Sequence, residues 1–267
     1  MIYATGLAAI AFYLASSADL FRRVRKGFVP NRPWGLSVVF VSIALLLHTL
    51  TAYPQVVSEQ GYNFSFFQVS SLIFLAISFM GLLTLLSKQP VHSLLLVLFP
   101  FAAIAIACSL FLSSNYTPRL EMQPGVAAHV LLSVVSLGLL TAAALQSLLL
   151  YVQMQQLKDR QTHGVIEALP PLETMEWLLF KILLAGLVCL SLALILGGIY
   201  VDDLFAQHLV HKTVFSIAAW LVFAALLWGR YRLGWRGLTA VKMTLTGLVL
   251  LTIGFFGTKL MLELILK

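Results

Sequence analysis

The chain alternates between long apolar runs and short polar segments along its whole length of 267 residues. A helix that spans a membrane requires roughly 20 consecutive apolar residues. Eight runs meet this requirement, and they predict helices at about 2–21, 34–56, 64–87, 91–113, 126–155, 177–200, 209–229 and 238–264. The pattern therefore predicts an all-α integral membrane protein, a bundle of about eight transmembrane helices that forms a single domain over residues 1–267.

Composition agrees with a chain that is surrounded by lipid. Hydrophobic residues make up 60% of the chain, charged residues only 10%, and the mean hydropathy is +0.96. A soluble domain carries about 25% charged residues. The formal net charge of +7 is better explained by basic loops on one side of a membrane than by a nucleic-acid partner. We therefore expect the lipid bilayer as the surroundings and no nucleic acid as a partner.

The basic residues lie mainly in the first, third, fifth and seventh connecting segments. The two richest segments contain Arg22, Arg23, Arg25, Lys26 and Arg32, and Arg230, Arg232 and Arg236. By the positive-inside rule these segments face the cytoplasm, so both termini are expected on the outer, periplasmic side of a bacterial inner membrane. The helix that starts near residue 126 keeps its pattern to about Arg160, and we expect its last turns to project into the cytoplasm.

Three of the six histidines fall at one predicted depth, in the outer third of the membrane. His48 lies about fourteen residues into its run, roughly 21 Å from the inner end. His129 and His211 each lie near the outer start of their helices. Imidazole is a common ligand of haem iron and of transition metals. This group of side chains is therefore the strongest indication of function in the sequence.

The three histidines differ in how well a simpler explanation fits them. A histidine at a helix end, such as His211, commonly just lies in the membrane interface. His48 lies in a run with no Asp, Glu, Lys, Arg or second His, and ionisable groups within a span are costly and tend to be functional. His129 begins a helix whose small residues suit close packing. These small residues are Ser133, Ser136, Ala143, Ala144 and Ser147.

From these differences we predict that His48 and His129 are the two axial ligands of a b-type haem, with His211 as a weaker candidate. His48 and His129 are also the candidate ligands of a metal ion. Lys259 and Glu263 lie four residues apart on the last helix, a spacing that suits a structural ion pair. Alternatively, Lys259 contacts a haem propionate at the outer face, so it is kept as a candidate cofactor-binding residue.

Three features stand out in the C-terminal third: Trp220, the turn Gly234-Trp235-Arg236-Gly237, and a last helix that contains glycines. The helix headed by His129 precedes them. Together, over residues 126–264, they resemble the cytochrome c assembly membrane proteins, the CcsA/CcmC-like haem-handling family. The resemblance implies a haem-handling protein in which His129 is a haem ligand at the outer face.

The chain departs from this family at two points. Haem-handling members carry a tryptophan-rich outer loop before the seventh helix, whereas the stretch here, VDDLFAQHLVHKTVF, contains no tryptophan. A histidine expected shortly before the glycine turn is replaced by Trp228. In these departures the chain resembles the HemX/YpjD branch. They imply that it keeps the scaffold but lacks the loop that presents haem to an apocytochrome.

We therefore expect a haem-binding or haem-handling inner-membrane protein with haem b as its cofactor. We do not expect an enzyme, because no nucleophile with a base and no carboxylate pair converges in the sequence. One alternative is a transporter, or a transport accessory protein, that affects divalent metal ions through the same histidines. Another is a structural or regulatory protein that acts on a membrane or cytoplasmic partner through the projecting end of the 126–155 helix.

Overall fold

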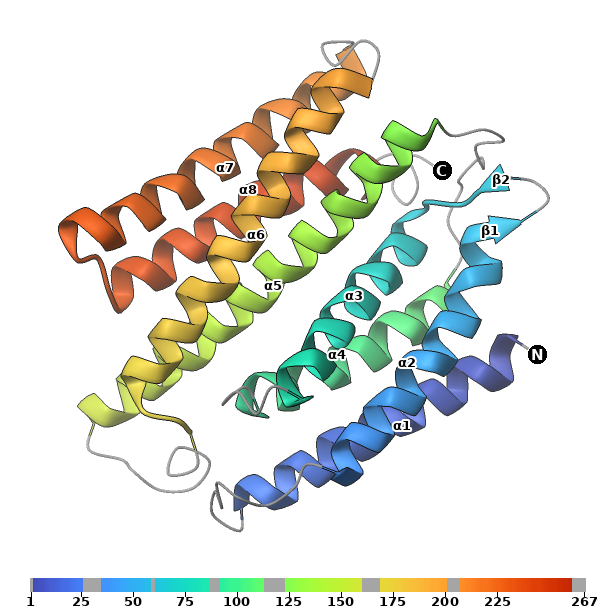
Figure 1. The fold of residues 1–267 in the computed structure, drawn as a ribbon, viewed down its shortest axis with the longest axis horizontal. Helices are drawn as coiled ribbons and strands as arrows, with labels where there is room; N and C mark the ends of the chain where they lie inside the picture. Colours follow the sequence, from blue (N-terminus) through green and yellow to red (C-terminus); the bar gives the residue numbers. More distant parts are fainter. Residues whose placement is uncertain are drawn as a thin grey trace.

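A computed structural model describes residues 2–25, 35–58, 61–86, 92–112, 123–159, 169–200 and 207–260 (Figure 1). Within these ranges its helices are α1 (Ile2–Arg25), α2 (Gly35–Val56), α3 (Phe66–Leu86), α4 (His92–Phe111), α5 (Pro124–Lys158), α6 (Leu172–Tyr200), α7 (Gln207–Leu233) and α8 (Leu238–Leu260). All eight are long and apolar enough to cross a membrane. The eight predicted spans are thus confirmed, with most ends displaced by a few residues.

Two helices are longer than a membrane crossing requires. α5 has 35 residues, which at the helical rise corresponds to about 50 Å, against a hydrocarbon core of about 30 Å. It ends at Lys158, close to the predicted end of its pattern. α6 has 29 residues and begins at Leu172 rather than near residue 177. Both helices therefore extend beyond the length of a single crossing.

One short hairpin was not predicted. β1 (Val57–Ser58) and β2 (Gly61–Tyr62) pair in an antiparallel manner directly after α2, with Val57 opposite Tyr62. Gly61 has a φ of 108°, a backbone conformation that side chains other than glycine rarely adopt. Strands of two residues are too short to show an alternating pattern, so the hairpin could not be predicted from the sequence.

The helices form two groups of four. In the first group α1 packs against α2 and α4, and α3 packs against the same two helices. In the second group α5 and α7 each pack against α6 and α8. The groups meet where α5 contacts α3 and α4 (Figure 1). Each group thus has the cyclic neighbour pattern of an up-and-down four-helix bundle.

Both chain termini lie at the same end of the molecule (Figure 1). We call this end, where α5 begins, the His129 end, and the opposite end the Trp235 end. Large apolar side chains such as Ile199 and Tyr231 project outward, an arrangement that suits a protein surrounded by lipid. Which side of the membrane each end faces stays a prediction from the basic residues.

Small residues bring α5 and α6 close together, as their sequence pattern predicts. Ser136, on α5, is fully buried, and its hydroxyl donates a hydrogen bond of 3.0 Å to the backbone carbonyl oxygen of Gly186 on α6. A Cβ atom at Gly186 would lie 2.8 Å from Cδ2 of Leu140. A further link comes from Gln146, whose Nε2 donates to the carbonyl oxygen of Met175 at 3.2 Å.

Candidate functional site

The ring of His129 packs against the last turns of α6, and one of its nitrogens is held by a hydrogen bond. Nδ1 lies 2.7 Å from the backbone carbonyl oxygen of Ala193. Because a carbonyl oxygen only accepts, Nδ1 carries the proton and donates it. Within the described part of the chain no hydrogen bond reaches Nε2. The ring is therefore in the tautomer that offers the Nε2 lone pair to a metal.

Gly197 makes room for this ring. A Cβ atom built at Gly197 would lie 2.9 Å from Cε1 and 3.1 Å from Nδ1 of His129, whereas one built at the next residue, Gly198, would meet nothing within 4 Å. On the α5 side, a Cβ atom at Gly125 would clash with the ring of Tyr200. The α5–α6 contact at the His129 end thus depends on glycine in both helices.

His48 lies in a different environment, at the centre of the first group of helices. Its side chain is 0% exposed. The hydroxyl of Tyr13 on α1 lies 3.2 Å from Nδ1, and the hydroxyl of Ser71 on α3 lies 2.8 Å from Nε2. A neutral imidazole has one donor and one acceptor nitrogen, and each hydroxyl can donate or accept. Both nitrogens of His48 are therefore satisfied, and three helices are joined through one ring.

The two predicted ligands have different hydrogen-bond partners in the structure. The ring of His129 contacts α6, whereas that of His48 contacts α1 and α3, so the two share no partner. His48 would have to give up one of its hydrogen bonds before it could bind iron. Ligation of one haem by this pair therefore stays a prediction.

The remaining predicted site residues fall near the ends of helices. His211 belongs to the first turns of α7 and Lys259 to the last turn of α8, but their side chains lie outside the described part of the chain, as does Glu263 altogether. Among the residues that the structure describes, no three His, Cys, Asp or Glu side chains gather as a metal site would require.

The glycine turn between α7 and α8 folds back onto α7. Gly234 has a φ of 69° and Gly237 a φ of 54°, conformations that favour glycine. The backbone N–H of Trp235 donates to the carbonyl oxygen of Gly229 at 3.2 Å. A Cβ atom at Gly229 would clash with the ring of Trp235. The three glycines therefore allow the tryptophan ring to lie against α7.

Glu176 on α6 holds this turn, and sequence reasoning missed it. Its Oε1 accepts a hydrogen bond of 2.8 Å from the backbone N–H of Gly237, and its Oε2 lies 3.8 Å from Nη1 of Arg230. The guanidinium of Arg230 lies over the ring of Phe180, 4.8 Å from its centroid. A carboxylate at this position satisfies a free N–H at the start of α8 and interacts favourably with the helix dipole.

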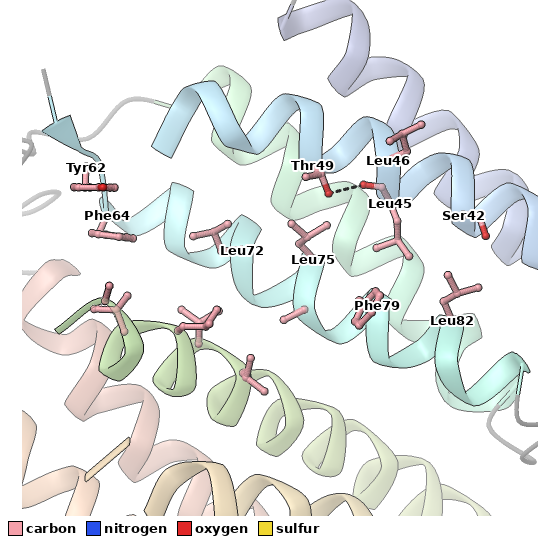
Figure 2. A pocket seen from close by; sticks show the side chains of 16 residues that line it. Ser42, Leu45, Leu46, Thr49, Tyr62, Phe64, Leu72, Leu75, Phe79 and Leu82 are labelled. Carbon is pink, nitrogen blue, oxygen red and sulfur yellow. Dashed lines mark hydrogen bonds between the residues drawn. The ribbon is translucent and has the colours of Figure 1, made fainter. Parts of the chain in front are cut away.

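A cavity of about 700 Å³ lies between the first group of helices and α5 (Figure 2). Its lining comes from α2, α3, α5 and the hairpin region: Ser42, Leu45, Leu46, Thr49, Tyr62, Phe64, Leu72, Leu75, Ala76, Phe79, Leu82, Ala127, Val130, Leu131, Val134 and Val135. None of these residues is charged. His48 and His129 belong to helices that line the cavity, but neither histidine lines it.

Comparison with known proteins gives a consistent result over most of the chain. Residues 36–266 match the model of a family described as Cytochrome C assembly protein. The chain is 34% identical to Inner membrane protein YpjD of Escherichia coli K12 over 233 residues, which cover 86% of this chain and 88% of that protein. No solved structure matches the chain.

Two further relatives carry names linked to this family or to its branch. The chain is 24% identical to Protein HemX of Brevibacillus brevis over 257 residues, 95% of this chain and 83% of that protein. It is 29% identical to Cytochrome c biogenesis protein CcsA of Nostoc punctiforme over 110 residues, 39% of this chain and 31% of that protein.

Proposed function

This chain belongs to the cytochrome c assembly protein family, and from that premise we propose that it is a haem-handling, multi-pass protein of the bacterial inner membrane. The similarity to YpjD and HemX agrees with the predicted HemX/YpjD-like branch. The name of the Escherichia coli relative and the eight candidate spans support the location. Family membership supports a role related to haem or to cytochrome c biogenesis.

The residue proposed to bind haem is His129. The observation that carries this proposal is the hydrogen bond from Nδ1 to the carbonyl oxygen of Ala193. Metal-ligating histidines usually donate their second N–H to such an acceptor, which fixes the ring orientation and makes the ligating nitrogen more basic. His129 therefore fits the requirements of an axial ligand through Nε2. Bound haem would supply the iron, and this chain would hold and orient it.

For the second axial position we propose His211 in preference to His48. α7 begins at the end of the molecule where α5 begins, so His211 belongs to the same end as His129. His48 already uses both ring nitrogens for hydrogen bonds to Tyr13 and Ser71. Lys259, near the end of α8, keeps its proposed contact with a propionate. The assignments of His211 and Lys259 extend the proposal for His129. If either of them is wrong, the proposal for His129 still stands.

We further propose that the chain holds haem without presenting it to an apocytochrome. The stretch before α7 contains no tryptophan, and the resemblance associates presentation with a tryptophan-rich loop. A protein of this kind would act as a haem reservoir or as a partner of other assembly proteins.

Absorption spectroscopy of the protein purified in detergent tests the proposal. We expect a Soret band from protein produced with added haem, and its loss in His129→Ala. His48→Gln, which changes a histidine at a similar predicted depth, is the matched control and should keep the band. A folded wild-type protein with no Soret band after haem supplementation would overturn the proposal.

A further inference from the structure

The cavity between the two groups of helices is lined by residues other than the candidate histidines. Figure 2 shows side chains of α2 and α3 around it, with α5 along its other side. Its volume of about 700 Å³ lies within the range of small-molecule sites, roughly 300–1,000 Å³. The groups of helices contact each other beside it through α3 and α5, so an occupant would touch both.

The lining suits a hydrocarbon and offers little to a polar ligand. Apart from apolar side chains it contains only Ser42, Thr49 and Tyr62. The hydroxyl of Thr49 already donates to the carbonyl oxygen of Leu45 at 2.9 Å. No charged side chain among the lining residues could pair with an ionised group. Burial of apolar surface is therefore the main interaction that the cavity can offer.

The cavity is long, and its sides are exposed where lipid would lie. Its lining extends from Phe64, just before α3, to Leu82 near the end of that helix, which corresponds to roughly 25 Å along the helix axis. One leaflet of a bilayer contributes about 15 Å of hydrocarbon. Leu46 and Leu131, two of the lining residues, are 63% and 65% exposed. A chain from the surrounding lipid could therefore enter from the side.

Haem does not fit this cavity as the structure stands. Neither His48 nor His129 lines it. Nε2 of His48 is hydrogen-bonded to Ser71 and the ring of His129 packs against α6. A haem placed here would have no axial histidine from either residue and no cation among the lining side chains for its propionates.

We propose that this cavity binds one acyl chain of a membrane phospholipid, which inserts between the two groups of helices. The inserted chain fills the space between α3 and α5 and supports the contact between the groups. The headgroup stays outside the lining, in keeping with the absence of charge among the lining residues. This inference does not rest on the proposed haem function.

Photo-crosslinking tests the inference on the full chain. The protein is placed in vesicles of phosphatidylethanolamine and phosphatidylglycerol that contain a phospholipid with a diazirine on one acyl chain. Val134 and Leu45 line the cavity and are only 5% and 8% exposed, so bulk lipid hardly reaches them. We expect labelling at both after irradiation, and none at Leu140, which is buried away from the cavity.

Two variants fill the cavity from opposite sides. Ala76→Phe on α3 and Ala127→Phe on α5 should each reduce the labelling of Val134 and Leu45 several-fold. Ala185→Phe places the same ring on an exposed position of α6 outside the lining, and should leave the labelling unchanged. If Ala76→Phe does not fold, Ala127→Phe still tests the inference.

Several results would overturn the inference. One is labelling of Val134 and Leu45 no stronger than that of Leu140, and another is labelling that neither folded variant changes. A haem or a quinone that co-purifies with the protein and is lost in the filled variants would identify another occupant. His129→Ala should leave the labelling intact, so failure of the haem proposal and failure of this one can be told apart.

Discussion

The Nδ1 atom of His129 on α5 lies 2.7 Å from the backbone carbonyl oxygen of Ala193 on α6. One helical turn further along α6, Gly197 leaves the space that the same ring occupies. A single turn of α6 thus holds the imidazole through a hydrogen bond and accommodates it through a missing side chain. Both features fix the direction in which Nε2 points.

Gly197→Ala should displace the ring of His129. The added Cβ would lie 2.9 Å from Cε1, and forcing an extra carbon into a packed contact costs about 1–3 kcal/mol. We expect a lower melting temperature in detergent and a several-fold weaker Soret band. Gly198→Ala is the matched control, since its Cβ meets nothing within 4 Å. If both variants behave alike, the ring does not depend on Gly197.

Tyr13→Phe should destabilise the first group of helices without removing haem. The substitution takes away the hydroxyl 3.2 Å from Nδ1 of His48 and leaves a buried nitrogen without its partner. Hydrogen bonds between membrane helices contribute about 0.5–2 kcal/mol. Thermal denaturation of detergent-purified protein measures the loss, with the Soret band as the second readout.

Tyr3→Phe is the control for this change, because Tyr3 lies on the same helix with its side chain 59% exposed. It should leave the melting temperature unchanged. A Tyr13→Phe protein that is as stable as wild type would show that the hydrogen bond to His48 contributes nothing. If Tyr13→Phe instead loses the Soret band while its melting temperature is unchanged, the result would support His48 as a haem ligand.

Glu176→Ala should loosen the turn between α7 and α8. The change leaves the N–H of Gly237 without its acceptor and Arg230 without its nearby carboxylate. Hydrogen bonds to charged groups contribute about 1.5–3 kcal/mol. Hydrogen exchange should show faster exchange of the Gly237 amide. Glu173→Ala, which removes an exposed carboxylate one turn earlier on α6, should not change that rate.

The helices could be predicted because lipid leaves the backbone few choices. A chain within a bilayer must satisfy its own N–H and C=O groups, and the bilayer thickness sets the length of each apolar run. The start of α6 and the hairpin at Val57–Tyr62 were harder to predict. Both lie at the ends of apolar runs, where the apolar pattern no longer determines the structure. The match over residues 36–266 extends the resemblance, seen in residues 126–264, into the first half.

The sequence places each histidine along its helix, but it does not give the direction of the ring. Depth follows from the number of residues along a helix, and it groups His48 with His129. The direction of each ring depends on the rotation of its helix against its neighbours, which a single sequence does not give. The two rings therefore contact different helices. Glu176 and Gly237, 61 residues apart, form a contact with no local signal at all.

Ligation of haem by His129 is tested by removing the imidazole and supplying it again in solution. In His129→Gly the side chain is absent, and free imidazole can occupy the space that it leaves. We expect the Soret band of the purified protein to disappear in His129→Gly and to return, at the wild-type position, when imidazole is added. A His129→Gly protein that keeps the wild-type spectrum without imidazole would contradict the assignment of His129 as the haem ligand.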